Sequence, residues 1–180
     1  KNEGIDVGHL AQNTRRELKL FFEDGIEPTI DAEKDPDWQA FHAWRANVVA
    51  NLVSEVREAL YPDVTLAIIP TVQSPNSLCW SEGSDLTLLA SAADRLEIPV
   101  YQTGLSSMTA DVKQVRIAAG PEARIGYILR PSYPNIYSIT QLREAVNMIK
   151  NAGAETISFY NYGHIRLESL DWIQSVFTEL

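Results

Sequence analysis

The sequence predicts an α/β fold of four consecutive strand-helix units whose strands form one parallel sheet. Four short apolar runs begin at residues 64, 98, 123 and 155, and a helical pattern follows each of them. Their starts lie 34, 25 and 32 residues apart, the length of a strand, a helix and their loops. Two architectures accommodate such units. They are part of a (βα)8 barrel, which needs about 250 residues when complete, and a doubly wound sandwich.

Helices are predicted before the first strand. Residues 8–24 place leucine and phenylalanine among charged residues, and Gly25 would end that helix. Asp35 and Pro36 then suit a helix start, because Asp caps free N–H groups and Pro fits the first helical position. Apolar residues recurring every three or four positions predict one packed stripe on this second helix: Phe41, Trp44, Val48, Val49, Leu52, Val53, Val56 and Leu60.

The first three units are predicted from apolar runs and from the helical patterns between them. The runs at 64–69 and 98–101 predict buried strands. A helical pattern connects them through four residues: Leu86, Leu89, Ala93 and Leu96. A helix over 109–119 then leads to a third strand at 123–129.

The last unit begins with a helix start at Ser138. Ser138 and Gln141 have the spacing of a capping box, and Gly153 would end the helix. The fourth strand is predicted at 155–160, and a closing helix begins near Leu167. We expect one domain over residues 1–180.

The composition excludes several classes of function. The chain has 180 residues, of which 45% are hydrophobic, and its net charge of −9 disfavours a nucleic-acid partner. Its apolar runs are far shorter than the roughly 20 residues that cross a bilayer, so no membrane contact is expected. One cysteine and three separated histidines predict no metal site. No glycine-rich phosphate loop is present, and no cofactor is expected.

Candidate binding residues lie in the loops that follow the strands, where parallel α/β folds bind their ligands. These loops contain aromatic, amide and arginine side chains, which predict a substrate-binding set: Gln73, Trp80, Tyr101, Arg130, Tyr160, Asn161 and Tyr162. Aromatic rings can stack on a sugar while amides and guanidinium groups bind its hydroxyls. The pattern therefore favours a neutral polyhydroxylated ligand such as a saccharide.

Several of these residues also have a structural interpretation. Trp80 could cap the rim of the sheet, and Arg130 could form a structural tie to a loop carboxylate. Of Tyr160 and Tyr162, which share a face, one is expected to pack in the core. His164 is interpreted as a loop or helix-start residue.

The sequence assigns no catalytic residues. Glycoside hydrolysis normally needs two carboxylates that flank the bond, and none follows the four strands. The available acids lie elsewhere: Glu27, Asp31, Glu82, Asp85, Glu168 and Asp171. These acids do not form a convincing acid and base pair.

Several motifs resemble glycoside-hydrolase-like TIM (βα)8 barrels. The helix text WQAFHAWR at 38–45 resembles the helix before the fifth strand of such barrels. The texts YILRP at 127–131 and GAETISFYNYG at 153–163 are similar to their seventh and eighth strands. The likeness covers roughly residues 35–165 and implies a carbohydrate-active protein that comprises the C-terminal half of a barrel.

The resemblance also implies how the chain is divided. Residues 1–34 would be a loop and helix region after an upstream strand, and residues 35–180 would be a helix and four βα units. The acid that such barrels carry after strand four would lie outside this chain. The positions after strands seven and eight, where a second carboxylate is often found, are Arg130 and Asn161, which does not favour hydrolysis by this half alone.

Three functions follow as hypotheses. The chain is part of a glycoside hydrolase, a non-catalytic saccharide-binding barrel, or a doubly wound domain that binds a partner protein. A half-barrel would expose sheet edges and interior residues, expected to be Ile68, Val100, Ile128 and Phe159. We therefore expect this chain to associate with its missing half or with another copy.

Overall fold

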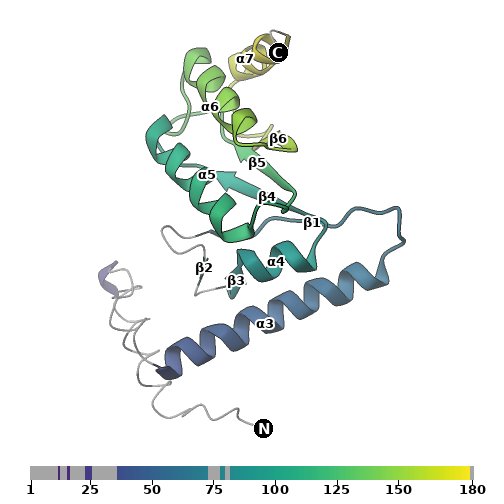
Figure 1. Ribbon diagram of the computed structural model, residues 1–180. Coiled ribbons are helices and arrows are strands. Elements are labelled where there is room, and N and C mark those ends of the chain that lie inside the picture. Colours follow the sequence, from purple (N-terminus) through teal and green to yellow (C-terminus); the bar gives the residue numbers. More distant parts are fainter. Residues whose placement is uncertain are drawn as a thin grey trace.

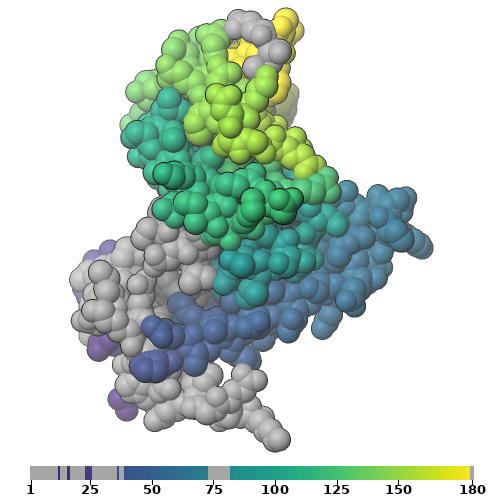
Figure 2. Space-filling view, in the orientation of Figure 1, coloured from purple at the N-terminus to yellow at the C-terminus, as the bar shows by residue number. Residues whose placement is uncertain are grey.

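The computed structural model describes residues 36–72, 78, 79 and 82–178, together with positions 12, 16 and 23–25. Its helices and strands follow in chain order: α3 (Pro36–Ala59), β1 (Ala67–Ile68), β2 (Leu78–Cys79), β3 (Ser84–Asp85), α4 (Leu86–Ala92), β4 (Arg95–Val100), α5 (Leu105–Ala119), β5 (Ile125–Leu129), α6 (Ile139–Asn151), β6 (Thr156–Phe159) and α7 (Leu167–Thr178). The molecule is elongated, with α3 along one end and α7 at the other (Figure 2).

The main sheet has four parallel strands in the order β1-β4-β5-β6. The strands are therefore neighbours in sequence order, which confirms the prediction of consecutive parallel units. In the doubly wound alternative a later strand would lead the order. The second sheet, a short antiparallel pair of β2 and β3, was not predicted.

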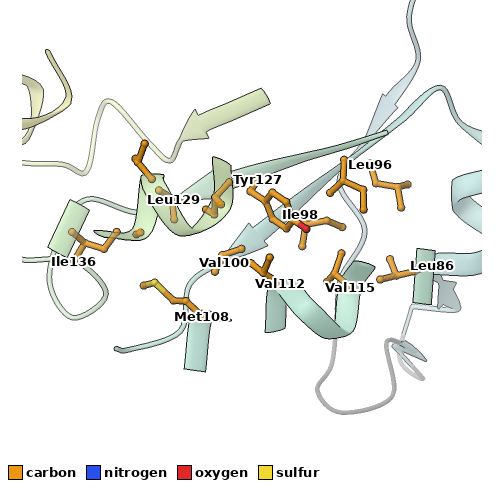
Figure 3. Packing of buried hydrophobic residues seen from close by; sticks show 14 of the residues in the cluster. Leu86, Leu96, Ile98, Val100, Met108, Val112, Val115, Tyr127, Leu129 and Ile136 are labelled. Carbon is orange, nitrogen blue, oxygen red and sulfur yellow. The ribbon is translucent and has the colours of Figure 1, made fainter. Parts of the chain in front are cut away.

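The helices of the four units pack on one face of this sheet, and Figure 1 shows α5 and α6 lying along it. Side chains alternate along a strand, and Ile98 and Val100 of β4 face Val112 and Val115 of α5 (Figure 3). The remaining strands of the main sheet and the helices that follow them also contribute residues to this core, among them Leu89, Leu129, Val146, Phe159 and Val176. The hydrophobic core thus lies between the sheet and its helices.

The opposite face carries residues that are absent from this core, and we call it the open face. It is formed by Glu97, Pro99, Gly126, Ile128, Thr156 and Ser158. Glu97, Gly126 and Thr156 share one row, and the Thr156 hydroxyl donates to Glu97 Oε1 at 2.9 Å across the glycine. No helix among the described residues packs its buried side chains on this face.

Ion pairs join the strands near their amino ends. Arg95 pairs with Glu97 at 2.8 Å and with Glu155 at 3.6 Å. Arg124 also binds Glu155, and this hydrogen bond is the main reason that the pKa of the Glu155 carboxyl lies below its ordinary value. The charges at this end of the sheet are therefore paired with one another.

The helix boundaries predicted from the sequence are largely confirmed. α3 begins at Pro36, and α6 begins after Ser138, whose hydroxyl accepts from the Gln141 N–H at 3.2 Å. Gly153 follows α6 with a φ of 76°, a conformation that favours glycine. The predicted helix over 8–24 and the Asp35 cap lie largely outside the described residues.

Two strand predictions are wrong in part. The run at 64–69 contributes only Ala67 and Ile68, and Ile69 is 66% exposed, because β1 is an edge strand paired on one side. β4 begins at Arg95, three residues before the predicted start at 98. Leu96, predicted in the preceding helix, is therefore a strand residue.

The predicted stripe of α3 packs against the core only in part. Two of its members, Val49 and Val53, do so beside the buried Ala46 and Ala50. Four other members are exposed, and we call them the α3 stripe: Trp44, Val48, Leu52 and Val56. Small residues let α3 approach α4 closely, so the buried face is not the most hydrophobic one.

The predicted interior residues are also mostly misplaced. Ile68, Val100 and Phe159 belong to the helix-side core, and only Ile128 lies on the open face. The alternation of side chains explains this, because a shift of one residue moves a side chain to the other face of a sheet.

Candidate ligand-binding site

The parallel strands finish at one edge of the main sheet, which we call the carboxyl edge. The last residues of three neighbouring strands, Val100, Leu129 and Phe159, are in register across β4, β5 and β6. The next residue of each strand is Tyr101, Arg130 or Tyr160, and the Tyr160 N–H donates to the Leu129 carbonyl oxygen at 2.9 Å. By alternation these three continue the open face. We call them the tyrosine–arginine row.

The two rings of this row lie against each other. Their centroids are 5.8 Å apart with an interplanar angle of 37°, within the range of favourable aromatic pairs. Burial and then the Tyr160 hydroxyl raise the pKa of Tyr101, while the Arg130 guanidinium opposes this rise. The positive charge of Arg130 is therefore felt at the Tyr101 hydroxyl.

Two hydrogen bonds from buried side chains fix the loops around this row. The Asn135 side-chain amide donates to the Tyr101 carbonyl oxygen, which joins the loop after β5 to the end of β4. The Ser169 hydroxyl, on α7, donates to the Pro131 carbonyl oxygen at 2.7 Å. The start of α7 is thereby held against the loop that carries Arg130.

An open pocket of about 440 Å³ lies between these loops, and we call it the cationic pocket. Six of the described residues line it: Arg130, Ser132, Tyr133, Tyr137, His164 and Arg166. Four of them come from the segment after β5, and His164 and Arg166 come from the turn between β6 and α7. None of these six side chains is a carboxylate. Because Arg130 belongs both to the pocket and to the tyrosine–arginine row, the two form one continuous site.

The two arginines of the pocket have different surroundings. Arg166 pairs with Glu168 at 2.6 Å, and its guanidinium lies 5.4 Å from the Trp172 ring centroid. These contacts orient Arg166 while Glu168 offsets part of its charge. The Arg130 guanidinium makes no hydrogen bond or ion pair with any residue that the structure describes. The predicted structural tie of Arg130 to a loop carboxylate is thus not present there.

The structure brings together three of the seven predicted binding residues, namely the tyrosine–arginine row. Asn161 and Tyr162 follow in the next turn, where the Asn161 carbonyl oxygen accepts the His164 N–H at 2.9 Å. Tyr162 is 79% exposed and Tyr160 is also exposed, so the expectation that one of them packs in the core is wrong. Gln73 and Trp80 lie outside the described residues.

Most residues of the pocket were not predicted from the sequence. Ser132, Tyr133, Tyr137 and Arg166 were not predicted, and His164 was interpreted as a loop residue. One signal was available in the distribution of tyrosine. The chain has seven tyrosines, and all except Tyr61 and Tyr127 lie in the segments that follow β4, β5 or β6.

Metal ligands are not gathered at this site. Within the described ranges, no three His, Cys, Asp or Glu side chains lie close enough together to hold a metal ion. In the same part of the chain, no helix combines the length and apolar character that spanning a membrane requires.

No protein-family model matches the chain, and a search of curated proteins also finds no match. The residues of the site must therefore carry the assignment of function.

Proposed function

We propose that this chain is a saccharide-binding part of a glycoside-hydrolase-like (βα)8 barrel. The observation that carries this proposal is the tyrosine–arginine row, in which aromatic and guanidinium groups from three neighbouring strands meet at the carboxyl edge. Ligand sites of parallel α/β folds occupy this edge. Sugar rings bind through stacking on aromatic faces and hydrogen bonds to their hydroxyls.

The arrangement of the sheet supports the barrel over a doubly wound fold. The strand order follows the sequence, and the helix-side core excludes the open face. Parallel sheets are normally covered on both faces. Further βα units would close the sheet on the open side and place this face in the interior of a barrel. The tyrosine–arginine row would then line the mouth of that barrel.

The role proposed for this chain is binding and orientation of the saccharide. Hydrolysis needs two carboxylates around the bond, and the described part of the site presents arginine, tyrosine, serine and histidine instead. If the assembled protein is a hydrolase, its acid and base come from residues outside this set. A barrel that binds without cleaving the sugar is the second candidate, favoured by the same lack of carboxylates.

Binding of neutral oligosaccharides to the full chain tests the proposal. Tyr160→Ala removes one ring of the row, and Tyr61→Ala is a matched control because Tyr61 is 79% exposed in the loop after α3. A ring contact of about 0.5–1.5 kcal/mol corresponds to a loss of roughly 2- to 13-fold in affinity. We expect this loss in titration calorimetry for Tyr160→Ala and none for Tyr61→Ala. Equal binding by both variants would refute the proposed site.

A further inference from the structure

We infer that the cationic pocket binds an oxyanion, a carboxylate or a phosphate, carried by the saccharide that the neighbouring tyrosines contact. The sugar in this inference rests on the proposed function, whereas the anion rests on the pocket itself. The site would thus prefer acidic sugars, such as a uronate or a sugar phosphate, to the neutral ligand that the sequence favours.

The charge of the pocket is opposite to that of the chain. The net charge is −9, yet the described residues of the lining include two arginines and a histidine and no carboxylate. The two arginines come from separate segments, which the Ser169 hydrogen bond to Pro131 holds together. A concave surface lined by one sign of charge concentrates ligands of the other sign.

Arg130 is the side chain of the pocket best suited to bind an oxyanion. It is a partly buried residue, and its guanidinium lacks a carboxylate partner among the described residues. Taking a charge partly out of water without a partner is unfavourable, and a bound anion would offset that cost. The planar fork of a guanidinium fits two oxygens of a carboxylate or phosphate at once.

The rest of the lining has the donors that an oxyanion needs. Ser132, Tyr133 and Tyr137 carry hydroxyl groups, and the His164 ring can donate an N–H. Arg166 is already oriented by Glu168 and Trp172. Glu168 stands beside the pocket as a competitor for Arg166, so Arg130 is expected to contribute more to anion binding.

The position of Arg130 connects the anion to the sugar. It follows β5, between Tyr101 after β4 and Tyr160 after β6, and it also lines the pocket. A sugar ring resting on the tyrosines would place a charged substituent within reach of the guanidinium. One ligand could therefore occupy both parts of the site.

Titration calorimetry at constant ionic strength tests this inference with four ligands: glucose, glucuronate, glucose 6-phosphate and inorganic phosphate. We expect at least one acidic sugar to bind about tenfold or more tightly than glucose. Which of the two binds better distinguishes a carboxylate from a phosphate ligand. Arg130→Gln should remove this preference, because it should weaken binding of the acidic sugars far more than binding of glucose, whose hydroxyls can still accept a hydrogen bond from the glutamine amide.

Two further variants separate the effect of the pocket from effects of misfolding and of net charge. Circular dichroism would reveal whether Arg130→Gln impairs folding. Arg166→Gln changes an exposed side chain. It should weaken the preference for acidic sugars even if Arg130→Gln impairs folding. Lys113→Gln removes one exposed positive charge on α5, away from the pocket, and should change nothing. An equal effect of Lys113→Gln would overturn the inference, because binding would then follow net charge alone.

The remaining outcomes separate this inference from the proposed function. If glucose and the acidic sugars bind equally, the anion site is refuted while saccharide binding stands. If inorganic phosphate binds through Arg130 and no sugar adds affinity, saccharide binding is refuted while the anion site stands. If no ligand binds, both are refuted.

Discussion

Replacing Gly126 with alanine should destabilise the sheet, because the Glu97 side chain crosses this glycine to reach Thr156. A Cβ atom at Gly126 would lie 2.0 Å from Thr156 Oγ1 and 2.3 Å from Glu97 Oε2. Both groups would have to move, which breaks their hydrogen bond. A hydrogen bond to a charged group contributes about 1.5–3 kcal/mol, and alanine regains roughly 0.5–1 kcal/mol over glycine in a strand. The net loss is therefore about 0.5–2.5 kcal/mol.

Thermal and urea unfolding of Gly126→Ala measure this loss. A chain of this size should melt about 1–10 °C lower. Gly163→Ala is the matched control, since its Cβ would meet only Asn161 Oδ1 at 3.7 Å, and it should change stability by less than about 0.5 kcal/mol. In a Thr156→Ala background the effect of Gly126→Ala should shrink, because the bond is already absent. An unchanged or raised stability of Gly126→Ala would refute the crossing of Glu97 over Gly126.

Three further predictions concern protons, polar burial and association. Burial, with Arg45 nearby, lowers the pKa of His42 to about 4. The unfolded chain then binds more protons between about pH 6.5 and 4, and stability should fall as pH drops through that window. His42→Gln should flatten this fall in melting curves, and an unchanged slope in that variant would contradict the assignment. The Tyr127 hydroxyl is buried without a hydrogen-bond partner among the described residues, so Tyr127→Phe should be neutral or stabilise by up to about 1 kcal/mol. A larger loss in denaturant unfolding would reveal a partner. The α3 stripe leaves large apolar side chains exposed, so analytical ultracentrifugation should show self-association, and a folded monomer at every concentration would argue against it.

Local signals in the sequence were sufficient to locate most helices and strands. Pro36, Ser138 and Gly153 act through their immediate neighbours, and the structure has helix boundaries at all three. The start of β4 was missed because Arg95 and Glu97 interrupt its apolar pattern. Arg95 and Glu97 pair with each other, and each also binds a residue about sixty positions away, Glu155 or Thr156. A local pattern could not reveal these contacts with the neighbouring strands, which hold the two charges inside a sheet.

The difference between local signals and long-range contacts also explains which residues of the site could be predicted. Tyr101, Arg130 and Tyr160 could be found because each follows a strand, and parallel strands finish at one edge. The pocket could not be found, because it depends on how α7 returns to the loop after β5. Ser169 and Pro131, which make that contact, are 38 residues apart. The pattern on α3 likewise indicated an amphipathic helix without indicating which face would be buried.

Saccharide binding at the tyrosine–arginine row can be mapped on the chain by NMR. Backbone amide shifts of the labelled chain would be followed during titration with an oligosaccharide of the preferred charge. We expect the largest changes at Tyr101, Arg130 and Tyr160, with smaller changes that extend into the cationic pocket. Changes centred on the α3 stripe or on the amino ends of the strands, with the tyrosine–arginine row unaffected, would contradict this expectation.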